Sequence, residues 1–257
     1  MRIEIKRATK SFGRIEALRG VDLVVPVGRR LALVGPNGSG KSTLIRALLG
    51  LIDCGGSVRL DGRSPYEDRV EIARRLAYVP QVAPALGATV HEIVQLVTLT
   101  RDLGVDAVRL SARTLEIDLG AINAQPFRNL SGGMKQKLLL AIAFAAKPLL
   151  LVMDEPTASL DANARERFFK LCADLSSAVT LVLCSHRLEE LRQLADHVVA
   201  MEEGRITFDG PAAEYLAGGR TRTATAAPDV TLDRLLGLPP DVVVCRRSTA
   251  DEGSLDD

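Results

Sequence analysis

A short segment near the N-terminus has the composition of a loop that binds phosphate groups. The pattern G-x-x-x-x-G-K-[ST] is matched by Gly35-Pro36-Asn37-Gly38-Ser39-Gly40-Lys41-Ser42. Glycines let the backbone curl so that its N–H groups converge on phosphate oxygens. Lys41 supplies a compact positive charge for the β- and γ-phosphates, and the Ser42 hydroxyl can bind Mg²⁺. We therefore expect this segment, extended to Thr43, to bind a nucleotide.

Two adjacent carboxylates follow an apolar run later in the chain. Asp154 and Glu155 come directly after Leu149–Met153, which predicts a buried strand. Successive strand residues point in opposite directions, so the two carboxylates can have separate roles. We expect Asp154 to hold Mg²⁺ through water and Glu155 to act as general base on an attacking water. A divalent cation nearby makes their mutual repulsion tolerable.

The flanking elements favour these interpretations over ligand-free surface turns. The apolar run Leu31–Val34 predicts a buried strand before the glycine-rich loop, and helical spacing of leucines predicts a helix from Lys41 to about Leu51. Further strands are predicted at 2–7, 21–25, 76–79, 149–153 and 180–184. Strands that alternate with helical segments indicate a largely parallel α/β sheet.

The middle of the chain has a helical pattern instead. Apolar residues from Val90 to Val97 recur at helical spacing, and a second helix is predicted over Leu110–Leu119. We expect a helical insertion at about 82–131 within a domain that spans 1–218. Residues 219–257 are rich in Thr, Ala, Arg and Pro and predict a weakly ordered extension, with a short helix at most over 232–238.

Composition narrows the class of protein. Hydrophobic residues make up 47% of the 257 residues, as in folded globular proteins, and the net charge of +1 predicts no nucleic-acid partner. Cys54, Cys172, Cys184 and Cys245 form no CxxC pair, which favours free thiols over a zinc site or disulfides. The longest apolar stretch is shorter than the roughly 20 residues that a bilayer requires. A role at a membrane would therefore need a partner.

A third segment carries a family resemblance. Leu130-Ser131-Gly132-Gly133-Met134 resembles the signature loop of ABC (ATP-binding cassette) ATPases. Further resemblances are those of Phe12 to the adenine-stacking aromatic, Gln81 to the Q-loop glutamine, Ser159-Leu160-Asp161 to the D-loop, and Ser185-His186 to the switch histidine. Together these positions cover about residues 2–217.

The resemblance implies a RecA-like P-loop NTPase core with an antiparallel β subdomain and an inserted α-helical subdomain. It also implies ATP and Mg²⁺ as ligands and ATP hydrolysis as the activity. Phe12 would stack on adenine unless it is a core residue. Gln81 would contact Mg²⁺ or the γ-phosphate, and His186 would hold the γ-phosphate and the attacking water.

Two segments are implied to act across a dimer. Ser131, Gly132 and Gly133 would face the γ-phosphate of ATP bound to a second copy, although serine is also a common helix cap. Asp161 would cross the interface, cap the helix from Ala162, or do both. Met134 stands where glutamine is common, so any polar contact from that side chain is lost.

The implied partners are a second ATPase domain and a membrane permease, with the protein peripheral on the cytoplasmic face. The short insertion and Lys135-Gln136-Lys137 after the signature loop are more similar to ATPases of exporter-type permeases. The segment Leu183–Arg187 resembles the ATPase that assists copper-site maturation of nitrous-oxide reductase. A soluble ABC ATPase in metal-cofactor or iron–sulfur assembly is the alternative.

Overall fold

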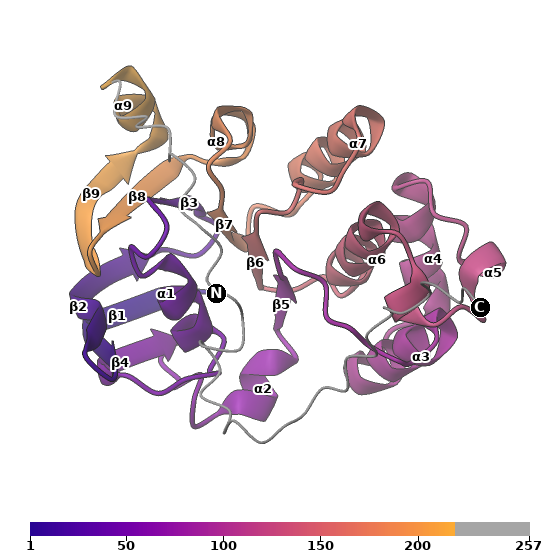
Figure 1. Cartoon of the computed structure of the whole chain (residues 1–257), viewed down its shortest axis with the longest axis horizontal. Helices are drawn as coiled ribbons and strands as arrows, with labels where there is room; N and C mark the ends of the chain where they lie inside the picture. Colours follow the sequence, from indigo (N-terminus) through magenta and orange to yellow (C-terminus); the bar gives the residue numbers. More distant parts are fainter. Residues whose placement is uncertain (219–257) are drawn as a thin grey trace, which may run out of the picture. The chain divides into compact units, whose positions relative to one another are not determined.

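The computed structural model describes residues 1–218, which form two β-sheets and a set of helices (Figure 1). The smaller sheet is antiparallel, in the order β2-β1-β4. Its strands are β1 (Ile3–Phe12), β2 (Ile15–Val25) and β4 (Gly55–Leu60). The first two extend beyond the predicted strands at 2–7 and 21–25, because β1 and β2 form a hairpin whose turn contains Gly13 at φ +58°.

The larger sheet has the order β5-β6-β7-β3-β8-β9. Its strands are β3 (Arg30–Val34), β5 (Leu76–Val79), β6 (Leu150–Asp154), β7 (Thr180–Cys184), β8 (His197–Glu202) and β9 (Arg205–Pro211). All neighbours from β5 to β8 are parallel, and β9 is an antiparallel edge strand. The predicted parallel α/β sheet is confirmed.

Both faces of this sheet are buried, as continuous apolar strands require. Leu151 and Met153 of β6 pack into a core that includes residues of α6 (Gly132–Ala145) and α7 (Ala162–Ala173). Leu150 and Val152 point the other way, into a core shared with α1 and the antiparallel sheet. The period of two along β6 therefore joins both layers to one strand.

The first helix, α1 (Lys41–Leu48), is shorter than the predicted span to Leu51. Gly50 has φ +67°, and a Cβ there would lie 1.9 Å from the carbonyl oxygen of Pro65. This left-handed residue, packed against another segment, ends the helix.

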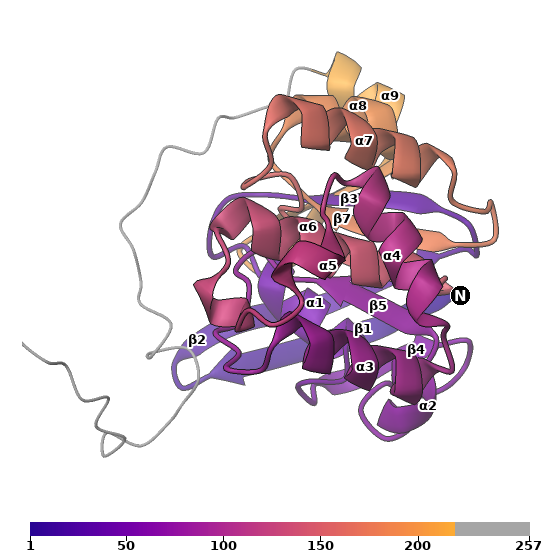
Figure 2. The same cartoon turned by 90° about the vertical axis from the view of Figure 1, so that its right-hand side faces the viewer.

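The helical insertion contains α3 (Val90–Arg101), α4 (Val105–Thr114), α5 (Leu119–Ile122) and the 3₁₀ turn η1 (Phe127–Asn129). These helices gather beside α6 in both views (Figures 1 and 2). A second helix is present where one was predicted, but the predicted bounds of 110–119 are wrong, because α4 spans Val105–Thr114 and Glu116 adopts φ +58°. Asp118 then caps α5 by accepting a hydrogen bond from the Gly120 N–H at 2.9 Å.

The two ends of α3 are held differently. Thr89 and Glu92 form a reciprocal capping box at its start. At its end, the Arg101 guanidinium donates to the carbonyl oxygen of Leu76, at the start of β5, over 2.6 Å. Burial lowers the pKa of Arg101. The insertion is thus bonded to the large sheet at the C-terminal end of α3.

The remaining helices are α2 (Arg69–Ala73), α8 (Leu188–Leu194) and α9 (Ala212–Ala217). Across residues 1–218, each helix is too short or too polar to cross a bilayer. Cys54, Cys172 and Cys184 are free thiols. Cys245, the predicted extension 219–257 and its helix at 232–238 lie outside the described residues, and the predicted domain division at 218 stays a prediction.

Candidate active site

The predicted site residues lie where neighbouring parallel strands end. The glycine-rich loop follows β3, Asp154 ends β6, His186 follows β7, and Gln81 follows β5. Because β5, β6, β7 and β3 are adjacent and parallel, their carboxyl ends share one edge of the sheet. Ligands of open α/β sheets bind at this edge.

The loop between β3 and α1 depends on glycine for steric reasons. Gly35 has φ +144°, and a Cβ there would lie 2.2 Å from the carbonyl oxygen of Met201. Gly40 has φ +102°, and its Cβ would lie 2.4 Å from the carbonyl oxygen of Ala17. Gly40 is also the N-cap of α1 and supplies no capping side chain. The first N–H groups of α1 are therefore available to an anion.

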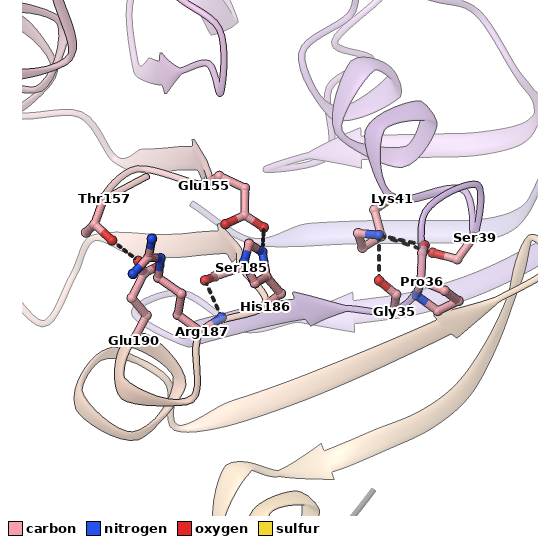
Figure 3. A network of polar contacts seen from close by, with 10 residues as sticks. All are labelled: Gly35, Pro36, Ser39, Lys41, Glu155, Thr157, Ser185, His186, Arg187 and Glu190. Carbon is pink, nitrogen blue, oxygen red and sulfur yellow. Dashed lines mark hydrogen bonds and ion pairs between the residues drawn. The ribbon is translucent and has the colours of Figure 1, made fainter. Parts of the chain in front are cut away.

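Lys41 lies inside this loop (Figure 3). Its Nζ donates to the carbonyl oxygens of Gly35 at 2.7 Å and Pro36 at 2.9 Å. The ammonium is thereby held on the concave side of the loop, where phosphate groups would bind. The other predicted loop residues differ in exposure: Asn37, Gly38 and Ser42 are exposed, whereas Ser39 and Thr43 are buried.

Asp154 lies within electrostatic reach of the loop. Burial has the largest influence on the pKa of Asp154 and raises it. The Cys184 thiol and the positive charges of Lys41 and Arg46 lower this pKa, by smaller amounts. A half-buried carboxylate at this edge is best stabilised by a cation. Oxygen ligands suit Mg²⁺, so Asp154, the Ser42 hydroxyl and the Gln81 amide fit a magnesium site by their chemistry.

Glu155 and His186 are in direct contact (Figure 3). Glu155 Oε1 lies 2.7 Å from His186 Nδ1, and the side chains are 11% and 71% exposed. The Glu155 backbone has φ +47°, and its N–H donates to the carbonyl oxygen of Cys184 at 2.8 Å. Glu155 Oε2 is buried and accepts no hydrogen bond from residues 1–218. A carboxylate is thus held in place by an exposed imidazole at its Oε1.

Phe12 and Gln81 are both exposed, as ligand-contacting residues must be. Phe12 ends β1 with 38% of its surface exposed, so it is not a core residue. The Lys10 ammonium lies 5.7 Å from the centroid of its ring. An exposed aromatic ring with a cation beside it can accept a stacked base. Gln81 is exposed directly after β5.

The signature segment begins α6. Ser131 is the N-cap, and its hydroxyl oxygen accepts a hydrogen bond from the Met134 N–H at 3.2 Å. Gly132 and Gly133 form the first turn. In Figure 1 α6 lies on the far side of β6 from α1, so one copy of the chain does not bring this segment to its own phosphate loop.

Asp161 caps α7, one of the two roles predicted for it. Its carboxylate accepts from the Ala164 N–H at 2.8 Å and pairs with Lys137 Nζ at 3.4 Å. The Ala164 N–H is the largest cause of a lowered pKa at Asp161. The role across a dimer interface stays a prediction.

Two buried polar residues behind the site, Thr157 and Glu190, were missed from the sequence (Figure 3). Ser185, named from the sequence only as the residue before His186, is buried as well. Thr157 donates a short hydrogen bond to Glu190 Oε1. One signal was present: Glu190 shares the apolar face of α8 with Leu191 and Leu194, where a carboxylate is unexpected.

Comparison with known proteins identifies the family. The model of the ABC transporter family matches residues 18–158. The chain belongs to the ABC transporter family. Membership confirms the predicted resemblance and the predicted class of ATP-binding, ATP-hydrolysing domain.

The relatives of this ABC ATPase are named for several different functions. An ABC transporter ATP-binding protein of Streptomyces avermitilis is 37% identical over 222 residues, which are 85% of the chain and 39% of that protein. The nickel import ATP-binding protein NikO of Rhodobacter capsulatus is 34% identical, over 83% of the chain and 91% of that protein. The daunorubicin/doxorubicin resistance ATP-binding protein DrrA of Streptomyces peucetius is 32% identical, over 99% and 81%. The chain thus spans about two fifths of the first relative and most of the other two.

Solved structures confirm the fold. An ATP-binding subunit of an ABC transporter superimposes with a TM-score of 0.76 at 25% identity, covering 88% of this chain and 96% of that one. The dimeric ABC transporter cassette MJ0796 superimposes with a TM-score of 0.73 at 24% identity, covering 82% and 98%. The predicted P-loop NTPase fold with its antiparallel β subdomain is therefore confirmed.

Proposed function

We propose that two copies of this ABC ATPase bind two ATP molecules between them and couple hydrolysis to a separate membrane permease. The contact between Glu155 and His186, at the edge of the sheet that carries the phosphate loop, is the observation that supports hydrolysis most directly. A carboxylate in contact with an imidazole at this edge supports the roles of a general base and of a group that orients the water.

The residues have separate tasks in the reaction. Lys41 and the loop N–H groups hold the β- and γ-phosphates, and Phe12 stacks on adenine. Glu155 accepts the proton of the attacking water, while His186 orients that water and the γ-phosphate. Bound Mg²⁺ supplies positive charge against the phosphate oxygens, and Ser42, Asp154 and Gln81 would hold it.

The second copy completes each site in this proposal. Ser131, Gly132 and Gly133 present the N-terminal end of α6, which attracts the γ-phosphate of the partner's nucleotide. Asp161 lies near the same surface through its pair with Lys137. The similarity to a cassette whose structure is dimeric supports this arrangement.

The permease partner is proposed from the family and from the surface. Relatives that the chain covers well are named for nickel import and for drug resistance. We propose an exporter-type permease because the helical insertion is short, and a location on the cytoplasmic face of the membrane. The mostly exposed segment Gln81–Thr89 is the proposed contact. The narrower resemblance to the nitrous-oxide reductase maturation ATPase stays a sequence-based prediction.

Replacement of Glu155 by glutamine tests the catalytic part. Glu155→Gln keeps the shape of the side chain and removes the base, so we expect ATP affinity to be retained, turnover to fall about a thousandfold, and an ATP-dependent dimer to accumulate. Size-exclusion chromatography with light scattering measures the dimer. Glu166→Gln, on the exposed face of α7, is the control. Normal hydrolysis by Glu155→Gln would contradict the role of Glu155.

Co-purification of the chain from its native membranes tests the coupling. We expect a multi-span permease to be recovered with the wild-type chain. Recovery of a soluble metal-cofactor or iron–sulfur assembly scaffold in its place would favour the alternative function.

A further inference from the structure

Glu190 is a fully buried carboxyl group directly behind the proposed catalytic pair. It lies in the first turn of α8 with none of its surface exposed. Burial has the largest influence on the pKa of Glu190 and raises it. The hydroxyls of Thr157 and Ser185 lower this pKa, and the charge of Glu155 raises it. A buried carboxyl group is costly and adds little net stability compared with an apolar side chain. Its presence therefore calls for another explanation.

The contacts of Glu190 join two segments that come from different strands. Thr157, which donates to its Oε1, belongs to the turn after β6 that begins at Glu155. In that turn the Ala158 N–H donates to the carbonyl oxygen of Glu155 at 3.2 Å. The backbone of Glu155 and the side chain of Thr157 are thus parts of one tight turn.

The second segment follows β7. Ser185 is buried beside Glu190, and its Oγ accepts the Arg187 N–H at 3.0 Å, which closes a turn around His186. The Leu191 N–H donates to the carbonyl oxygen of Arg187, so α8 continues directly from this turn. The position of Glu190 is therefore coupled to the backbone that carries His186.

We propose that Glu190 is a positioning residue that holds the turn of Glu155 and the turn of His186 in register for hydrolysis. This inference rests on the function proposed above. The 2.7 Å contact between Glu155 and His186 joins side chains from separate strands, so a small shift of either turn breaks it. The bond between Thr157 and Glu190 ties the same two segments together on the buried side (Figure 3).

Substitutions at Glu190 separate positioning from stability. Glu190→Leu keeps the approximate volume and leaves the Thr157 hydroxyl without its acceptor. We expect its kcat to fall about ten- to a hundredfold, as for other small displacements of catalytic groups, with the Kd for MgATP within about twofold of wild type. Glu190→Gln keeps the acceptor oxygen and is expected to restore kcat to within about threefold.

The neighbouring Glu189 supplies matched controls. It lies on the same turn of α8 but is exposed, and it bonds only weakly to Gln193 at 3.4 Å. Glu189→Leu and Glu189→Gln are expected to match the wild type in kcat, Kd and thermal midpoint.

Substitutions at Thr157 approach the same bond from its other end. Thr157→Val should reproduce the loss of kcat, Thr157→Ser should not, and Thr157→Val combined with Glu190→Leu should be no worse than either alone. If Glu190→Leu does not fold, the comparison of Thr157→Val with Thr157→Ser decides.

The outcomes separate this inference from the proposed function. A wild-type chain that binds and hydrolyses no MgATP would overturn the proposed function. A wild-type chain that is active, with Glu190→Leu or Thr157→Val at normal kcat, would overturn only the role of Glu190. Losses of kcat and ATP affinity in equal proportion would also overturn it, because they would indicate a general structural defect.

Discussion

The starts of α1 and α6 are both glycine-containing helix N-termini, and they are built in opposite ways. The N-cap of α1 is Gly40, a left-handed residue without a capping side chain, preceded by a loop that Lys41 holds by two short hydrogen bonds. The N-cap of α6 is Ser131, whose hydroxyl oxygen accepts from the Met134 N–H. The first end is left open to an anion, whereas the second is already capped by its own serine.

The start of α1 therefore has N–H groups that a bound nucleotide can pair, whereas the start of α6 is capped without any ligand. The unpaired N–H groups of α1 and the charge of Lys41 gain most from a phosphate. The start of α6 needs no ligand for its stability, so the role proposed for it at the nucleotide of a second copy is separate from folding. Substitutions at the two helix starts should therefore have different consequences.

Removal of Lys41 should have the largest effect. Lys41→Ala deletes the charge that faces the phosphates, so we expect ATP turnover to fall by about a hundredfold or more. Calorimetric titration with ATP should show weakened binding while the fold is kept. Lys170→Ala, on the exposed side of α7, is the control. Full turnover by Lys41→Ala would remove the distinction between the two helix starts.

Replacing one glycine near each helix start by alanine should show whether that glycine is needed for stability or for turnover. Gly35→Ala places a methyl group against the carbonyl oxygen of Met201 at a positive φ, so we expect a loss of about 2 kcal/mol or more in the free energy of unfolding. Gly132 has open space around its Cβ position, so Gly132→Ala should leave stability within about 0.5 kcal/mol.

Denaturant unfolding and ATPase assays together measure this contrast. We expect Gly132→Ala to lose turnover although its stability is unchanged, because an added methyl group would obstruct the proposed partner's nucleotide. Unchanged turnover in Gly132→Ala would argue against a close approach at this position.

Removal of the Ser131 cap should have a moderate effect. Ser131→Ala leaves an N–H of α6 without its acceptor and should cost about 1 kcal/mol of stability. Ser131→Thr retains the oxygen and should keep most of it. A stability loss in Ser131→Ala as large as that in Gly35→Ala would mean that the start of α6 is as constrained as the phosphate loop.

Met134→Gln should have the smallest effect. Met134 is half-buried at the start of α6 and packs at the edge of the core. Glutamine fits there with a change of about 0.5 kcal/mol in stability, and it can add one polar contact to a partner's nucleotide. Thermal unfolding and the concentration dependence of the ATP-bound dimer are the measurements. A large gain in dimer affinity would show that the methionine weakens this surface.

Local patterns in the sequence predicted the strands that precede the glycine-rich loop and the paired carboxylates, and these strands are present. Gly35–Lys41 and Asp154–Glu155 are short segments whose chemistry is set by adjacent residues and by the strand before each. The predicted end of the helix at 119 is wrong because a single left-handed residue, Glu116, interrupts an apolar pattern that continues on both sides.

Contacts between distant segments could not be predicted in this way. The Thr157–Glu190 bond spans 33 positions, and it forms because β6 and β7 are neighbours in the sheet. Neither residue belongs to a motif that the resemblance covers. The contact of His186 with Glu155 likewise depends on the pairing of β6 with β7, which local sequence patterns do not specify.

The hydrogen bond of the Arg101 guanidinium attaches α3 to the large sheet at the C-terminal end of the helix. The far end of this 12-residue helix bonds to Gln125, within the same helical region, while the Arg101 end bonds to β5. Such a helix is about 18 Å long. A tilt of about ten degrees around Arg101 would therefore carry Val90 roughly 3 Å, with almost no travel at the sheet. A push on the proposed contact segment Gln81–Thr89 would then move the start of α3 much further than its end.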